Sequence, residues 1–230
     1  MAALWTGWLL ALLLGVRHAS EPDHLAAVST LLAEHPHSRR GALLGAFWGL
    51  GHSLALLCVG GLLLALHLRL PGTIADLFEL LVAMMLLVLG ARSIVRAFAA
   101  GRGGANHAHH HGPTQHSHGG VDDHVHVAAW TLGRRPLLIG LMHGLAGSGA
   151  LTALALASMP TLGSGLVYMV LFGLGSIAGL ALLTGLADLP LRALSQRRSL
   201  TIALNAAAGT IALGLGVMWG WPLLLRLTAV

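Results

Sequence analysis

The sequence predicts an all-α, polytopic membrane protein whose six transmembrane helices form two inverted three-helix repeats. Three observations predict this class. Hydrophobic residues make up 56% of the 230 residues and charged residues only 9%, whereas soluble domains carry about 25% charged residues. Six apolar runs approach or exceed the roughly 20 residues that a spanning helix needs. Short motifs also recur at a nearly constant offset between the two halves of the chain.

The six predicted spans are apolar runs separated by polar loops. An alternative for the start of the first run is a secretory signal peptide, but that segment lacks a basic n-region and has Arg17 where small residues should follow. We therefore expect one long first helix, interrupted at Glu21-Pro22. The predicted spans cover residues 4–32, 41–66, 74–98, 136–158, 162–187 and 199–225.

The basic residues predict the orientation of these spans. All 13 are arginines, and ten of them flank or occupy the loops after the first, third and fifth spans. Because cytoplasmic loops are enriched in basic residues, we expect those loops in the cytoplasm and both termini outside. The pI of 11.3 follows from these loops, so the expected partner is the lipid bilayer and not nucleic acid.

Three pairs of segments suggest an internal duplication. Their offset is 124 or 125 residues in every case. Because each copy has three spans, an odd number, the second copy begins on the opposite side of the membrane and is inverted relative to the first. Inverted repeats are common in transporters. Coincidence among Leu- and Gly-rich helices is the alternative. We expect repeats at residues 1–98 and 134–230. The matching segments are residues 15–18 with 140–143, 48–51 with 172–175, and 89–90 with 213–214.

Five ionisable residues lie within eight positions of the first span, where each costs about 2.5–3.5 kcal/mol at the bilayer centre. Arg17 and Glu21 have i, i+4 spacing, and we expect them to form an ion pair. Pro22 disfavours helix at the residue before it. The resulting unwinding could bring three side chains to a common point: His18, Asp23 and His24.

Two more histidines lie in glycine-rich parts of other spans. His52 belongs to the second span and His143 to the fourth. Neutral imidazoles with a carboxylate suit nickel, cobalt or zinc and are poor ligands for calcium or magnesium. A hydrogen-bonded packing role is the alternative for either histidine alone. The sequence therefore predicts a metal site of His18, Asp23, His24, His52 and His143.

Two of these motifs are similar to those of the nickel/cobalt transporter family, the high-affinity nickel permeases. Residues 17–28, RHASEPDHLAAV, resemble its His-x4-Asp-His signature, and residues 47–53, FWGLGHS, resemble its Gly-His-Ser motif. With HGLAGSGAL at residues 143–151, the short chain resembles the six-span urease-accessory nickel permease branch. The acidic third motif of longer permeases is absent. The resemblance implies that His18, Asp23, His24 and His52 belong to the metal path.

A His-rich, Gly-rich segment separates the two halves. Residues 99–133 have no residues that could form a core, so we expect a cytoplasmic loop that is disordered without metal. His-rich tracts bind transition metals. This loop either collects metal or is a solvated linker that binds metal adventitiously. Its histidines are His107, His109, His110, His111, His116, His118, His124 and His126.

The favoured function is a secondary transporter that moves nickel, or cobalt, across the bacterial cytoplasmic membrane, with import favoured by the resemblance. The chain has no Gly-x4-Gly-Lys-Ser/Thr phosphate loop, so ATP is not expected as its direct energy source. We expect no cofactor, because the metal is the cargo, and a cytoplasmic metallochaperone is a candidate partner. Efflux, with the loop as collector, stays open, as does a membrane metal sensor or chaperone.

Two other classes fit the residues less well. An intramembrane metalloenzyme would need a general base beside an open metal position, as in His-Glu-x2-His, and no such motif is present. We therefore expect no enzyme. A thiol electron carrier needs two cysteines, and the chain has only Cys58.

Overall fold

Long helices make up most of the chain, apart from one short β hairpin. The computed structural model describes residues 2–34, 41–101, 107–111, 114–118, 129–195 and 197–228. The second predicted span is a continuous run in which a π-helical turn, η1, joins two α-helices. The helices are α1 (Ala2–His18), α2 (Pro22–Glu34), α3 (Gly41–Ala55), η1 (Leu56–Gly60), α4 (Gly61–Ala65), α5 (Gly72–Gly101), α6 (Ala129–Ser158), α7 (Leu162–Ser195) and α8 (Arg198–Thr228).

Four helical runs in the described part of the chain are long and apolar enough to cross a membrane. The first of the six predicted spans is instead divided into α1, of 17 residues, and α2, of 13. The fourth predicted span is α6, which has 30 residues but is not among the four. The protein is therefore a polytopic helical membrane protein. The four runs are Gly41–Ala65, Gly72–Ala99, Leu162–Leu191 and Arg198–Thr228.

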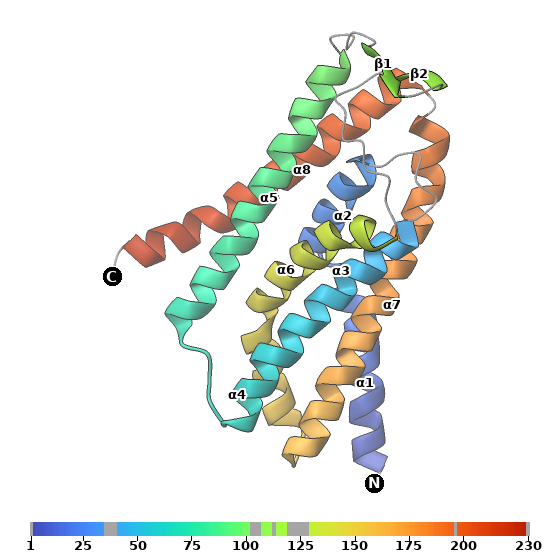
Figure 1. The fold of residues 1–230 in the computed structure, drawn as a ribbon. Helices are drawn as coiled ribbons and strands as arrows, with labels where there is room; N and C mark the ends of the chain where they lie inside the picture. The colour runs from blue at the N-terminus through green and yellow to red at the C-terminus, as the bar shows by residue number, and fades with distance from the viewer. Residues whose placement is uncertain are drawn as a thin grey trace.

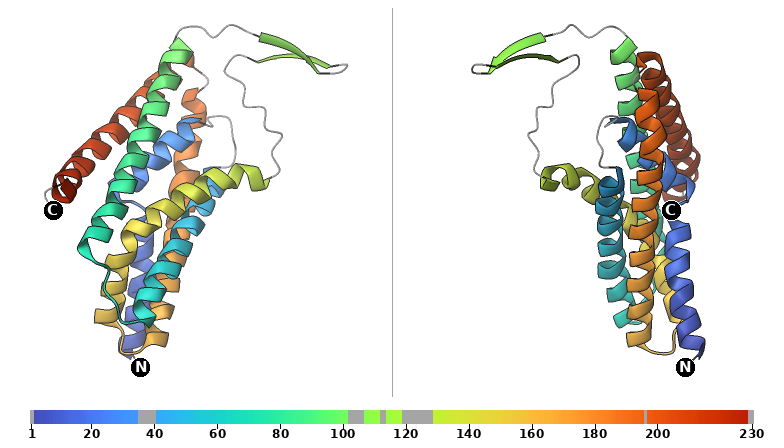
Figure 2. Two further views of the ribbon diagram at one scale, coloured as in Figure 1. Left: turned by 60° about the vertical axis from the view of Figure 1, so that its left-hand side comes forward. Right: turned by 90° about the vertical axis from the view of Figure 1, so that its right-hand side faces the viewer.

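The helices form a bundle with a helix pair beside it (Figure 1). α3 packs against both α6 and α7, and α7 packs against α1. α5 and α8 pack against each other along their length, and α2 contacts both of them. The two further views show the hairpin beyond one end of the helices and the N-terminus of α1 at the opposite end (Figure 2). The broken first span therefore connects the bundle to the α5–α8 pair.

Glycines allow the bundle helices to approach closely, and their contacts occur in matching pairs. A Cβ atom on Gly15 would overlap the carbonyl oxygen of Phe172, and a Cβ atom on Gly140 would overlap that of Trp48. Each pair joins positions that the sequence offset matches. A second set repeats the exchange, with Gly51 on Leu137 and Gly175 on Leu12. We call these four the reciprocal glycine contacts.

Buried polar side chains also join the helices. Asp188, on α7, is 3% exposed, and its Oδ2 accepts a hydrogen bond of 3.1 Å from the backbone N–H of Gly41, the first residue of α3. Ser53 donates 3.0 Å to the carbonyl oxygen of Gly173. The first bond provides a partner for one of the free N–H groups at a helix start, so Asp188 fixes where α3 begins.

A two-stranded antiparallel hairpin lies within the His-rich segment. Its strands are β1 (His107–His111) and β2 (Thr114–His118). His107 pairs with His118, and His109 pairs with His116. Helices occupy both ends of the predicted loop, because α5 continues to Gly101 and α6 begins at Ala129. The rest of the described chain is all-α as predicted, and the hairpin and these helix ends lie within the segment 99–133, which the sequence predicts as a loop that is disordered without metal. His124 and His126 lie outside the described residues.

Candidate functional site

The interruption predicted in the first span is present. α1 ends at His18 and α2 begins at Pro22. Turn-like bonds of 2.9 Å from Ser20 N to Arg17 O and 3.0 Å from Glu21 N to His18 O connect the two helices. Proline suits the first position of a helix because its missing N–H would have no partner there. Pro22 therefore starts α2 and places Asp23 in its first turn.

The predicted ion pair between Arg17 and Glu21 is wrong. Glu21 Oε2 lies 2.9 Å from His18 Nδ1 instead, and Arg17 is exposed. The prediction assumed that one helix continues through both residues, since i, i+4 neighbours face each other only on a helix. The helix ends at His18, so Glu21 turns back and contacts that residue.

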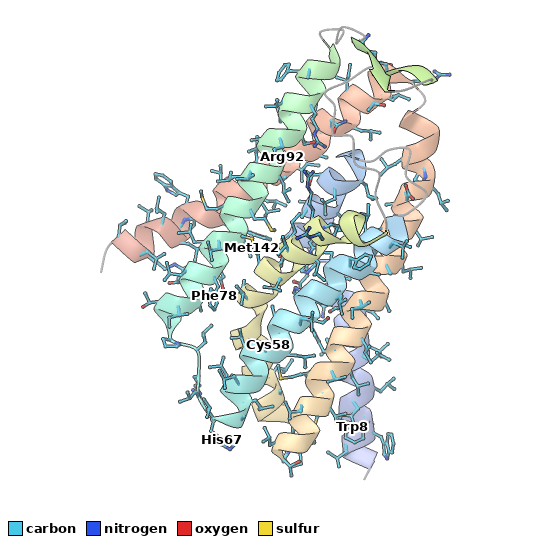
Figure 3. The ribbon with its side chains drawn as sticks, in the orientation of Figure 1. Trp8, Cys58, His67, Phe78, Arg92 and Met142 are labelled. Atoms are coloured by element: carbon cyan, nitrogen blue, oxygen red, sulfur yellow. The ribbon has the colours of Figure 1, made fainter. Side chains whose placement is uncertain are left out.

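The structure brings together all five residues predicted to form the metal site. His18 Nε2 lies 3.1 Å from His52 Nε2. His143 Nε2 lies 2.7 Å from Asp23 Oδ2, and His24 Nδ1 lies 3.1 Å from Asp23 Oδ1. The four imidazoles come from α1, α2, α3 and α6. Met142, labelled in Figure 3, directly precedes His143 on α6.

Two overlapping groups of potential ligands lie within this cluster. Within each group, one donor atom per residue lies within 4.8 Å of the others. His24 belongs to both, and its ring centroid lies 4.6 Å from that of His18 and 4.2 Å from that of His143. The cluster therefore offers two adjacent positions that share one imidazole. The groups are His18, His24 and His52, and Asp23, His24 and His143.

Three of the imidazoles are buried and carry a ring nitrogen without a partner. His24 and His52 are 0% exposed and His143 is 3% exposed. Among the described residues, no hydrogen-bond partner lies near His24 Nε2, His52 Nδ1 or His143 Nδ1. A buried polar group left unpaired costs about 1–3 kcal/mol. An ion that coordinates one of these nitrogens would supply the missing partner.

Two aromatic side chains form walls of the cluster, and neither is among the residues predicted for the site. Trp48 is fully buried and stacks on His24, with centroids 5.6 Å apart and an interplanar angle of 14°. Phe172 lies 5.3 Å from His18. Trp48 and Phe172 occupy matching positions at the offset of 124 residues, which is the signal that could have indicated their shared role.

A π-helical turn follows His52 on the same span. η1 begins at Leu56, one turn after His52. Such turns occur frequently at functional sites because they change the direction in which side chains project. Leu56 is 1% exposed and lines the cavity that reaches the cluster. The hydropathy pattern gave no indication of this irregular turn.

The fold and the cluster together define a polytopic helical membrane protein in which three buried imidazoles meet a half-buried imidazole and a half-buried carboxylate between four helices. A family model described as high-affinity nickel-transport protein matches residues 4–217. The chain therefore belongs to this nickel-transport family, and it is a transporter and not an enzyme.

A relative aligns with most of the chain. The chain is 29% identical over 218 residues to the urease accessory protein UreH of Bacillus sp. (strain TB-90), which covers 93% of this chain and 90% of the relative. No solved structure matches the chain significantly. The resemblance noted from the motifs is thereby confirmed at the level of the family.

Proposed function

We propose that this nickel transporter is a secondary importer of the bacterial cytoplasmic membrane, and that the ion passes through His18, Asp23, His24, His52 and His143. The observation that carries this proposal is the convergence of four imidazoles and one carboxylate inside the helices. Neutral imidazoles suit borderline divalent ions such as nickel or cobalt. Nickel is the cargo here, and the proposal includes no resident cofactor.

The spacing within the first group supports binding to one ion. With metal–nitrogen bonds of about 2.0–2.1 Å, ligands on the same ion lie about 3.0–3.4 Å apart. His18 Nε2 and His52 Nε2 are 3.1 Å apart. The unpartnered Nε2 of His24 could provide a third ligand. Hydration waters would then be replaced by three imidazoles.

Asp23 supports the cluster by orienting two imidazoles. If His24 Nδ1–H and His143 Nε2–H donate to the two oxygens of Asp23, the remaining lone pairs of both rings lie on their unpartnered nitrogens. Carboxylates that accept from a metal-ligating histidine fix its tautomer and raise its basicity. The shared His24 then allows an ion to move from one group to the other without leaving the cluster.

The proposal also includes the arrangement of the helices, which is six membrane spans in two inverted repeats. The reciprocal glycine contacts support it, because each contact made by one half is matched by a contact of the other half at the same offset. The break between α1 and α2 also supports it, since transporters bind ions at interrupted helices near the repeat interface. The cluster lies at such a break.

The orientation in this proposal has both termini outside, as the arginine distribution predicts. A cavity of about 620 Å³ reaches the cluster and is bounded by Arg226, close to the C-terminus. In this orientation the cavity lies on the outer side, where it would admit nickel in the outward-facing state of an importer. The His-rich segment would lie in the cytoplasm, where it could receive the ion or pass it to a metallochaperone.

Uptake of radiolabelled nickel by cells that express His24→Ala tests the proposal. We expect uptake to fall to background, because His24 belongs to both ligand groups. His67→Ala is the matched control, since this exposed histidine lies in the connection between α4 and α5. Normal uptake by a folded His24→Ala protein would exclude the cluster as the transit site.

The same cells distinguish the remaining alternatives. An importer raises the nickel content of the cell, whereas an exporter lowers it. Competition by unlabelled cobalt measures whether cobalt shares the path. Purified protein reconstituted into vesicles, without any other component, should carry nickel if it is a transporter, and should carry none if it is only a sensor or chaperone.

A further inference from the structure

The cavity beside the histidine cluster extends to a part of the protein that the proposed site does not include. His52 and His143 lie along its wall, and they are at least 97% buried, each with an unpartnered ring nitrogen. Other parts of the wall come from α5 and α8, including Glu79, Trp219 and Arg226. The cavity therefore connects the cluster with the ends of α5 and α8 that contain these residues.

Glu79 is a carboxylate inside a membrane-spanning run, Gly72–Ala99. It follows Phe78, which is labelled in Figure 3, and lies about 10 Å along the helix axis from the start of α5. Its side chain is exposed, and no ion-pair partner lies near it among the described side chains. An exposed carboxylate on the wall of a cavity does not pack against other side chains, so a packing role does not explain Glu79.

The cavity wall carries more acidic than basic side chains, with Glu21, Asp23 and Glu79 against Arg226. Arg226 lies 3.3 Å from Asp76 Oδ1, and Glu21 lies 2.9 Å from His18. Asp23 contacts His24 and His143. Neutral imidazoles do not cancel these carboxylates, and among the described side chains Glu79 is the cavity carboxylate that contacts neither a histidine nor an arginine. A cavity with an excess of negative charge concentrates cations.

We propose that Glu79 is a cation-relay residue, which draws a hydrated divalent cation into the cavity before the cation reaches the imidazoles. The inference rests on the proposed function of the cluster. Carboxylates bind cations that keep part of their hydration shell, whereas the buried imidazoles bind the dehydrated ion. For a divalent ion about 10 Å from one carboxylate in a water-filled space, Coulomb attraction corresponds to about a fourfold gain in the local concentration of the ion.

Initial rates of nickel uptake by Glu79→Gln over a range of nickel concentrations test this role. We expect the apparent KM to rise about fourfold and the maximal rate to stay within twofold of wild type. Added salt should reduce uptake less in Glu79→Gln than in wild type, because screening acts on the charge that the variant lacks. Glu79→Asp keeps the charge and should restore most of the wild-type KM.

A matched variant changes the charge in the opposite direction. Arg226→Gln frees Asp76 from its partner, so its apparent KM should equal or fall below that of wild type. An unchanged KM in Glu79→Gln, or a loss of maximal rate alone, would overturn the relay role. Thermal unfolding of each variant in detergent identifies any variant that is not folded, and Glu79→Asp then provides the comparison.

Failure of the relay role and failure of the cluster are distinguishable. Nickel binding to purified protein at equilibrium, measured by calorimetry, should be lost in His24→Ala and retained in Glu79→Gln. If His24→Ala abolishes uptake while Glu79→Gln matches wild type, only the relay role fails. If His24→Ala transports normally, the cluster itself fails.

Discussion

Replacing Gly140 with alanine tests the close contact between α3 and α6 that positions the histidine cluster. The added Cβ atom would overlap the carbonyl oxygen of Trp48 and lie 2.8 Å from its carbonyl carbon. Relaxed carbon–carbon contacts are about 3.5–4.0 Å. The two helices must therefore separate by about 1 Å. Trp48 stacks on His24 and lies 5.9 Å from His143, so the separation also disturbs the cluster.

Two contributions of opposite sign determine how Gly140→Ala changes the free energy of unfolding. Alanine gains about 1 kcal/mol over glycine in helix propensity. Overpacking typically costs about 1–3 kcal/mol and occasionally more, and the obstacle here is rigid backbone, so we place the cost at or above the upper limit. The net destabilisation is about 2 kcal/mol. For a chain of this size, that lowers the unfolding midpoint by about 4–8 °C.

The assay is thermal unfolding of purified protein in detergent, followed by nickel uptake. Gly214→Ala is the control, because a Cβ atom on Gly214 would meet no atom within 4 Å, and its midpoint should stay equal or rise. Gly15→Ala, at the matching position of the other half, should behave like Gly140→Ala. Equal midpoints for Gly140→Ala and Gly214→Ala would refute the reasoning, because the contact would then not be close enough to matter.

Three further predictions concern the site, the His-rich segment and the fold. Asp23→Asn should weaken nickel binding by about 10–100-fold in calorimetry, since one imidazole loses its acceptor; unchanged affinity would contradict the orienting role. Deleting residues 106–126 should leave most of the nickel flux, because the cluster lies in the helices; a complete loss in a folded variant would favour the sensor alternative. Asp188→Ala should lower the free energy of unfolding by about 1–3 kcal/mol, because the N–H of Gly41 loses its acceptor, whereas Asp188→Asn, which keeps an acceptor oxygen, should lose less. Equal stability of all three proteins in thermal unfolding would show that this bond contributes nothing.

Much of the site could be predicted because the cost of burying charge makes its residues conspicuous. The chain has only eight acidic residues, and a packing role is a poor explanation for Asp23, which lies between Pro22 and His24 and five residues after His18. The predicted partner of Glu21 was wrong, because an ion pair between Arg17 and Glu21 requires the helix to continue past His18. Hydropathy gives the limits of an apolar run to within a few residues and gives no information about a turn within it.

By itself, the sequence determined the class of protein, the approximate position of the helices and the five residues of the cluster. Composition and apolar run length are properties of the chain alone, since the bilayer imposes the same length on every span. Only the tertiary structure decided which residues face each other: His18 with His52, Asp23 with His143, and Trp48 with His24. These pairs depend on how far apart the helices lie and how they are rotated. Glycine contacts between helices set that packing, and residues far apart in the chain make them.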